Sequence, residues 1–163
     1  MQKKQKILIR LIIHILLNLT IIAVMLTIVL RLHYYNDNNM FPVLPRGSLL
    51  IAYRLEAPVR NDVVIYNADG NVRVGRIIAV ENDEVDISDS GEVLINGIPS
   101  NENMFYPTEK SDVSDMTYPH NVEKNSFFIL NDYRLDTNDS RQIGDVDKRS
   151  VIGAVILHIG KSM

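Results

Sequence analysis

Few side chains of this sequence can carry out covalent chemistry. The chain has no cysteine, which excludes disulfides, thiolate zinc sites and a cysteine nucleophile. Ser48 follows Gly47 without an evident base beside it, and the segment around His120 lacks the pattern of a nucleophile elbow. The four histidines do not have the spacing of zinc ligands, and no Gly-rich, Lys-containing phosphate loop is present. We therefore expect neither a metal nor a cofactor.

Charge divides the 163 residues into two unlike parts. Residues 1–35 contain five basic and no acidic residues, whereas residues 36–163 contain 12 basic and 20 acidic residues. A nucleic-acid-binding protein needs a basic face that displaces counterions from the phosphates. The acidic main part therefore argues against a nucleic-acid partner.

Residues 11–30 form an apolar run without charges between Arg10 and Arg31. A helix of about 20 residues rises about 30 Å, the thickness of a bilayer core. The run is longer than the apolar region of a cleaved signal peptide, and no small-residue cleavage site follows it. We predict a retained single-pass anchor at residues 11–30 of a protein of the cell membrane. The basic residues 1–10 then lie in the cytoplasm and residues 36–163 lie outside.

Three polar residues of this N-terminal region recur at intervals of four. Arg10, His14 and Asn18 share one face of the predicted helix. Polar groups within a membrane span often mark a contact with another helix. The alternative is that Arg10 extends to the lipid headgroups and that the bilayer tolerates a single asparagine.

From residue 36 onward the pattern is typical of an all-β domain. Short runs rich in Val and Ile alternate with turn residues. Residues 67–70, Asn-Ala-Asp-Gly, predict a hairpin turn, because Gly70 tolerates a positive φ. Residues 99–124 are polar and aperiodic, which predicts a loop excursion. The expected strands, mostly antiparallel in a mixed arrangement, are residues 49–54, 63–66, 72–80, 84–88, 92–95, 126–130 and 151–158.

Several segments resemble, in order, the conserved boxes of the type I signal peptidases, which remove signal peptides with a Ser nucleophile and a Lys base. The first box, Ser-Met-x-Pro-Thr-Leu, is similar to residues 39–44, Asn-Met-Phe-Pro-Val-Leu. The Lys box, Val-Lys-Arg-Ile-Ile-Gly, is similar to residues 74–79, Val-Gly-Arg-Ile-Ile-Ala. The last box, Gly-Asp-Asn-Arg-x-x-Ser-x-Asp-Ser-Arg, is similar to residues 131–141. The resemblance implies an anchored, extracytoplasmic signal-peptidase-like β domain.

The two catalytic positions of that family are changed here. Asn39 stands at the position of the Ser nucleophile, and Gly75 stands at the position of the Lys base. A carboxamide is no ordinary acyl-transfer nucleophile, and glycine has no side chain to accept a proton. The neighbouring Arg73 and Arg76 cannot replace the lysine, because a guanidinium stays protonated. The sequence therefore predicts a protein without catalytic residues.

Other residues of the boxes are kept. By the resemblance, Met40 and Pro42 frame the substrate cleft, and Ser140 matches the hydroxyl that binds the Lys ammonium. Asp139 and Arg141 match a structural ion pair. A vestigial cleft that binds an extended peptide is expected to contain Asn39, Met40, Pro42, Arg73, Gly75 and Ser140; in the alternative, these residues only maintain the fold.

This combination resembles the SipA-type signal-peptidase-like proteins, which are encoded with pilus genes of Gram-positive bacteria and lack the Ser–Lys pair. The resemblance implies a membrane-tethered chaperone or scaffold for pilus assembly. Its partners would be a pilin subunit and the sortase that joins pilins. The alternative is a divergent active signal peptidase that uses another nucleophile, such as Ser48.

Overall fold

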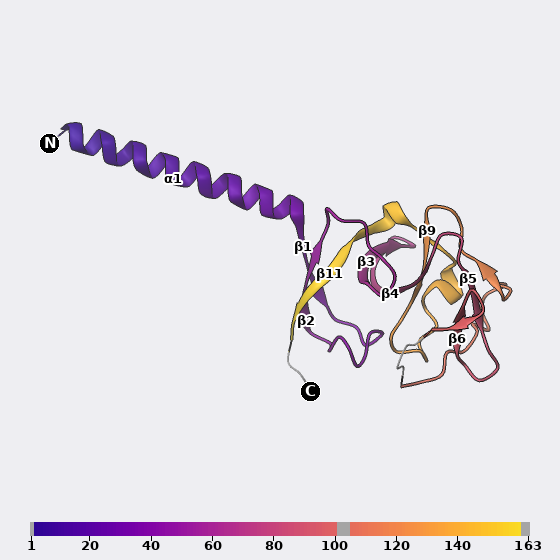
Figure 1. Ribbon diagram of the computed structural model, residues 1–163. Coiled ribbons are helices and arrows are strands. Elements are labelled where there is room, and N and C mark those ends of the chain that lie inside the picture. Colours follow the sequence, from indigo (N-terminus) through magenta and orange to yellow (C-terminus); the bar gives the residue numbers. More distant parts are fainter. Residues whose placement is uncertain (1, 101–104, 161–163) are drawn as a thin grey trace.

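The computed structural model describes residues 2–100 and 105–160, which form one long helix joined to a β domain (Figure 1). The helix, α1 (Gln2–Val29), includes a stretch from Lys4 to Val29 that is long and apolar enough to cross a membrane, and no other described part of the chain covers it. This fits the predicted membrane anchor. The basic residues before the predicted span belong to the same helix, which begins at Gln2.

The helix passes into the β domain without a connecting loop. Strand β1 (Leu30–Tyr35) begins at the residue after Val29, and the backbone N–H of Arg54 donates to the carbonyl oxygen of Val29 at 3.0 Å. Leu30, predicted as the last residue of the membrane span, therefore belongs to a strand. The sequence analysis missed β1 because its apolar residues continue the composition of the anchor.

The larger sheet has seven strands in the order β1-β2-β11-β3-β4-β9-β10, and every neighbouring pair is antiparallel. Val, Ile and aromatic residues dominate its central strands, as β propensity and burial on both faces require. The remaining strands of this sheet are β2 (Ser48–Tyr53), β3 (Val63–Ala68), β4 (Asn71–Val80), β9 (Ser126–Leu130), β10 (Val146–Asp147) and β11 (Val151–Ile159).

The smaller sheet has four short strands in the order β7-β6-β5-β8. Asp83, just before this sheet, is buried and accepts hydrogen bonds from Arg60 and Asn96, at 2.6 Å and 2.9 Å. These contacts join the turn after β6 to the loop before β3. The four strands are β5 (Glu84–Ile87), β6 (Val93–Ile95), β7 (Ile98–Pro99) and β8 (His120–Asn121).

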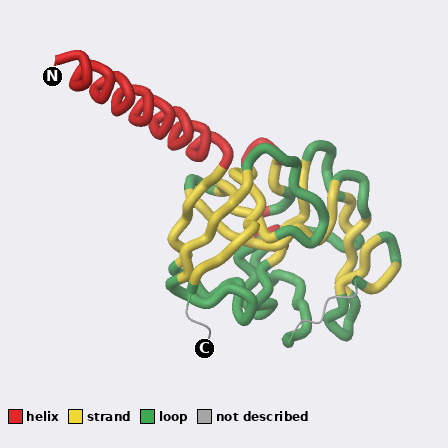
Figure 2. The backbone as a smooth tube through the Cα atoms, turned by 60° about the vertical axis from the view of Figure 1, so that its left-hand side comes forward, coloured by secondary structure: helices red, strands yellow, loops and turns green. Residues whose placement is uncertain are grey.

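Figure 2 shows a domain of strands joined by loops, as the sequence predicts. All seven predicted strands exist, with ends that differ by at most two residues. The predicted hairpin turn is shorter, because only Asp69 and Gly70 lie between β3 and β4, both with positive φ. The predicted excursion contains β8 and one residue of β7; its residues 101–104 lie outside the described chain. Two helices too short for a periodic signal are also present, α2 (Ser140–Ile143) and η1 (Lys148–Ser150).

The two faces of β4 border different parts of the core, which positions the candidate site. Val74 packs with Tyr35 and Met40 in one buried cluster. A side chain at the next residue, Gly75, would instead point toward Tyr66 and Ile129, which belong to a second cluster. Side chains of successive strand residues alternate in this way. Positions 74 and 75 are therefore adjacent in sequence and face opposite sides of the sheet.

Candidate functional site

An open groove of about 380 Å³ lies between β1 and the beginning of β4. One wall is β1 with the residues after it, the other wall is the first half of β4, and the segment after β9 adds Asp136 and Asn138. The lining is largely polar and is made by His33, Tyr34, Tyr35, Asn36, Asp37, Asn39, Asn71, Val72, Arg73, Val74, Asp136 and Asn138.

Asn39 lies in this groove, and three hydrogen bonds hold its carboxamide in place. Its Nδ2 donates to the carbonyl oxygen of Val74 at 2.8 Å and to the Oδ1 of Asn131 at 2.7 Å, and its Oδ1 accepts from the hydroxyl of Tyr35 at 2.7 Å. A carboxamide has two N–H donors, so both donors are used. Asn39 therefore connects three separate segments of the domain.

Tyr35 is the donor that fixes the carboxamide oxygen. Its own hydroxyl oxygen accepts from the backbone N–H of Met40 at 2.9 Å. Burial raises the pKa of Tyr35 well above its usual range, and the nearby carboxylates of Asp37, Asp132 and Asp136 raise it further. The hydroxyl thus keeps its proton and continues to donate to Asn39 at physiological pH.

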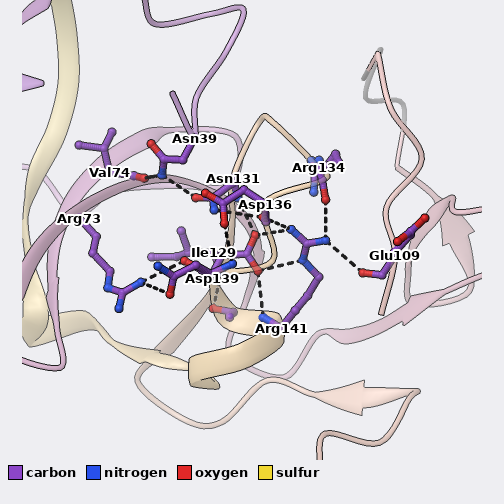
Figure 3. Close-up of polar contacts among 12 residues, drawn as sticks. Asn39, Arg73, Val74, Glu109, Ile129, Asn131, Arg134, Asp136, Asp139 and Arg141 are labelled. Atoms are coloured by element: carbon purple, nitrogen blue, oxygen red, sulfur yellow. Dashed lines mark hydrogen bonds and ion pairs between the residues drawn. The ribbon is translucent and has the colours of Figure 1, made fainter. Parts of the chain in front are cut away.

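The network continues from Asn39 into the buried end of the domain (Figure 3). The backbone N–H of Asn131 donates to the Oδ2 of Asp139 at 2.9 Å, and the side chain of Asn131 donates to the carbonyl oxygen of Asp136 at 3.2 Å. The backbone also contributes, because the N–H of Tyr133 donates to the carbonyl oxygen of Asn39 at 2.9 Å. Segments that begin at residues 39 and 131 therefore form one hydrogen-bonded unit.

Asp139 and Arg141 form an ion pair whose side chains are fully buried. The guanidinium donates to both carboxylate oxygens, at 2.9 Å and 2.7 Å, and its remaining N–H groups donate to the carbonyl oxygens of Glu109, Arg134 and Asp136. All five donors of Arg141 are thus used, as the burial of a guanidinium requires. Asp139 also caps α2 by accepting from the backbone N–H of Arg141 at 3.1 Å.

The space that a side chain at position 75 would need is already filled. A Cβ atom on Gly75 would lie 2.5 Å from the Cγ2 of Ile129 and 3.4 Å from the Cε1 of Tyr66. Real carbon contacts rarely fall below about 3.5 Å. The backbone of Ile129 is also fixed, because its N–H donates to the Oγ of Ser140 at 2.9 Å. Position 75, in the middle of β4, therefore has no room for a side chain unless Ile129 and Tyr66 move.

The structure places the residues expected in the cleft in different surroundings. Asn39 and Arg73 line the groove, whereas Met40 and Ser140 are completely buried, and Gly75 lies inside the domain. Pro42 is exposed and does not line the groove. Alternation along β4 directs Gly75 away from the groove, and the turn after Asn39 directs Met40 into the core. Ser140 lies in α2, where its Oγ accepts from the backbone N–H of Ile129.

Arg73 is held against one wall of the groove. Its guanidinium donates to the side-chain and backbone oxygens of Asn138, at 2.6 Å and 3.0 Å, and lies 3.5 Å from the carboxylate of Asp69. Its charge is therefore partly neutralised within the domain. It can contact a groove ligand but cannot act as a base.

The alternative nucleophiles are not placed for attack. Ser48 is completely buried, and its Oγ donates to the carbonyl oxygen of Pro45 at 2.6 Å. The Oγ of Ser140 is buried against Ile129. His120 contacts the carboxylate of Asp145 at 3.0 Å and forms no hydrogen bond with a serine within the described residues. Residues 2–100 and 105–160 also contain no cluster of three or more His, Cys, Asp or Glu that can hold a metal ion.

The polar face of α1 lies outside the domain. Arg10, His14 and Asn18 are all exposed, and the side chain of Asn18 donates to the carbonyl oxygen of His14 at 2.8 Å. This bond within one helix satisfies one amide donor. The contact with a partner helix remains a prediction.

Tyr35, Asn131 and Asp136 belong to the site, although sequence reasoning did not select them as site residues. Asn131 and Asp136 lie in the segment that resembles the last box, which was a usable signal. The only sequence signal for Tyr35 is its position four residues before Asn39. That spacing predicts a contact only once the structure shows that the chain turns between the two residues.

Known proteins are similar to this chain over most of its length. The family model described as signal peptidase, peptidase S26, matches residues 8–159. The inactive signal peptidase IA of Staphylococcus aureus (strain Mu50 / ATCC 700699) is 24% identical over an alignment of 153 residues, and the match covers 89% of this chain and 87% of that protein. Signal peptidase I of Bacillus caldolyticus is 26% identical over an alignment of 155 residues, and the match covers 82% of this chain and 84% of that protein.

A solved structure shares the fold. The crystal structure of a signal peptidase I from Enterococcus faecalis V583 matches with a TM-score of 0.51 at 21% identity, and the match covers 61% of this chain and 97% of that chain.

Proposed function

The chain belongs to the signal peptidase family, peptidase S26, and we propose that it is a member that holds an extended peptide in the groove beside Asn39 without cutting it. The observation that carries this proposal is the state of the two catalytic positions. The Asn39 carboxamide is held by three hydrogen bonds, and the space beside Gly75 is filled by Ile129 and Tyr66. Hydrolysis by a Ser–Lys pair needs a nucleophile and a base within hydrogen-bond reach.

The relatives named inactive signal peptidase IA support the same proposal, since they match most of this chain. The buried Ser48 and Ser140 leave the alternative, a divergent active peptidase, without an accessible nucleophile among the residues discussed.

Two open strand edges suit the groove for an extended peptide. β1 is the end strand of the larger sheet and pairs with β2 along one edge only, within the described chain. In β4, residues 71–74 pair with β3, and the pairing with β9 begins only at Arg76. Unpaired backbone groups of this kind bind an extended peptide as an added strand. The groove lies between these edges, so the backbone supplies affinity independently of catalytic residues.

The partner that we propose is a pilin subunit, together with the sortase that joins pilins. This step rests on the resemblance to the SipA-type proteins, whose sequences combine an anchor, the signal-peptidase boxes and the loss of both catalytic residues. The β domain then lies outside the cell, with residues 1–10 in the cytoplasm, as the basic N-terminal end favours. In this role the protein is a chaperone or scaffold that presents the pilin during assembly.

A photo-crosslinking experiment tests the groove as the binding surface. A photoreactive residue is placed at Val72, which lines the groove and is 46% exposed, in the full chain in its native cell. The matched control is Val113, which is 77% exposed and does not line the groove. We expect capture of a pilin or sortase from Val72 and not from Val113. Equal capture from both positions, or none from Val72 while pili still assemble, contradicts groove binding.

A cleavage assay tests the absence of catalysis. The detergent-solubilised chain is incubated with a precursor that carries a signal peptide, and we expect the precursor to remain intact. Cleavage that Ser48→Ala or Ser140→Ala abolishes, and that inhibitors of contaminating proteases leave unchanged, contradicts the proposal and favours the divergent peptidase.

A further inference from the structure

The side chains of Asn39 and Tyr35 line the groove but have no hydrogen-bond donor left for a ligand. Both N–H groups of the Asn39 carboxamide donate within the domain, to Val74 and to Asn131 (Figure 3). The hydroxyl of Tyr35 donates to the carboxamide oxygen and accepts from the backbone N–H of Met40. A ligand in the groove therefore cannot rely on these donors and must find its polar partners elsewhere in the lining.

The basic side chains of the lining, Arg73 and His33, carry little free positive charge at neutral pH. The Nη1 of Arg73 donates to the side-chain and backbone oxygens of Asn138, and its Nη2 lies 3.5 Å from the carboxylate of Asp69. Burial lowers the pKa of His33, and the nearby charge of Arg31 lowers it further, so its imidazole is neutral at pH 7. The lining thus offers an anionic side chain of a ligand no cation that is not already neutralised.

Two carboxylates of the lining, in contrast, have no cationic partner within residues 2–100 and 105–160. Asp37 lies in the segment after β1, and Asp136 lies in the segment after β9. The Oδ1 of Asp37 accepts from the backbone N–H of Asn38 at 2.6 Å, and the Oδ1 of Asp136 accepts from that of Asn138 at 2.9 Å. Within the same described ranges, the Oδ2 of each carboxylate accepts no hydrogen bond. Both charges and two acceptor atoms are therefore available to a ligand.

The two carboxylates act on the same part of the groove, although they come from distant segments. Burial raises the pKa of Tyr35, and the carboxylates of Asp37 and Asp136 raise it further. Their fields therefore meet at Tyr35, the residue that holds the carboxamide oxygen of Asn39. An extended peptide that lies between β1 and β4 passes this point, and every second side chain of such a peptide points toward the domain. A carboxylate placed there would be repelled, and an apolar side chain would remove water from the two charges without replacing it.

We propose that the groove selects extended peptides that carry a lysine or arginine side chain, whose cationic group binds the carboxylates of Asp37 and Asp136. Such a side chain supplies the N–H donors that the two carboxylates lack, in charge-assisted hydrogen bonds. The open strand edges bind the peptide backbone, and the basic side chain fixes the register in which the peptide lies. This inference rests on the proposed binding of a peptide in the groove and adds the chemical class of the segment that is bound.

Selection from a peptide library tests the proposal without assuming a particular sequence. The detergent-solubilised full chain is immobilised and incubated with synthetic peptides that have randomised positions, and mass spectrometry identifies the peptides that it retains. The test variant combines Asp37→Asn with Asp136→Asn, which removes both charges but keeps an oxygen that accepts from the same backbone N–H. The matched control combines Asp112→Asn with Asp115→Asn, because these two residues are exposed and lie outside the groove. Thermal unfolding verifies that both variants are folded.

We expect the wild-type chain and the control to retain peptides enriched in lysine or arginine at one position, and the test variant to lose this enrichment. Replacing that basic residue by norleucine in the best peptide should weaken its binding to the wild-type chain about tenfold, as measured by fluorescence anisotropy. Enrichment that the test variant keeps, or that the control loses equally, overturns the proposal. Retained peptides without any basic preference also overturn it and leave groove binding intact, whereas a library from which no peptide is retained contradicts groove binding itself.

Discussion

The side-chain Nδ2 of Asn39 donates to the Oδ1 of Asn131 at 2.7 Å, across 92 residues of sequence. This bond joins the segment that resembles the first family box to the segment that resembles the last one. In a Ser–Lys peptidase the first of these positions carries the nucleophile. Here the same position carries a carboxamide whose three hydrogen bonds join separate segments of the domain.

Asn39→Ala is expected to lower the stability of the domain. The change removes three hydrogen bonds and leaves the Tyr35 hydroxyl and the Asn131 amide oxygen without this partner. An unsatisfied buried polar group costs about 1–3 kcal/mol. Thermal unfolding of the full chain in detergent measures the loss, with Asn38→Ala as the matched control. The Asn38 side chain is exposed and makes no hydrogen bond within the described residues, so equal melting temperatures of the two variants would contradict the structural role of Asn39.

Gly75→Ala is expected to destabilise the domain because of one contact. The added Cβ would lie 2.5 Å from the Cγ2 of Ile129, and overpacking of a core costs about 1–3 kcal/mol. Ile129→Ala removes that methyl group, so a double-mutant cycle should show that the two changes together cost less than the sum of their separate costs. Additive free energies of unfolding would mean that the two positions do not compete for space.

Restoring the family residues is not expected to restore cleavage. Asn39→Ser with Gly75→Lys supplies both chemical groups, but the lysine has no room beside Ile129 and Tyr66, and the serine lacks the hydrogen bonds that fix Asn39. Catalytic groups need placement within about 0.5 Å. The readout is the fraction of a signal-peptide precursor that is cleaved. Efficient cleavage would mean that β4 can rearrange to accept a lysine, and would overturn the account of a blocked site.

The Asp139–Arg141 pair is expected to matter far more for stability than an exposed pair. Arg141→Met leaves the Asp139 carboxylate buried without its cation, which costs about 3–5 kcal/mol. Arg149→Met is the control, because Arg149 is 91% exposed and an exposed ion pair such as the one with Asp147 adds little to stability. Denaturant or thermal unfolding of both variants provides the comparison. Similar stability of the two would show that the buried pair is dispensable.

Much of the fold could be predicted from short-range pattern. Runs of Val and Ile bounded by turn residues located seven strands, and the long apolar run located the helix. The sequence could not separate β1 from the anchor, because apolar residues such as Leu30 and Leu32 are typical both of a membrane helix and of a strand. The short strands β7, β8 and β10 have two residues each, which is too few for any periodic signal.

The site could be predicted only in part. The resemblance identified Asn39 and Gly75 as changed positions, because those residues lie within recognisable boxes. Their surroundings depend on tertiary contacts that no local pattern encodes. The methyl group of Ile129 fills the space beside Gly75 from another strand, and Tyr35 reaches Asn39 only because the chain turns between them. Side-chain directions alternate along β4, so Gly75 faces the core. The resemblance to the family box did not indicate this.

The junction of α1 and β1 has a geometric consequence for any partner in the membrane. No loop separates Val29 from Leu30, and the hydrogen bond from Arg54 ties the end of the helix to the end of β2. Rotation of the helix about its own axis therefore turns the whole domain through the same angle about the membrane normal. A neighbouring helix that contacts the Arg10, His14 and Asn18 face would thus set the orientation of the groove within the plane of the membrane.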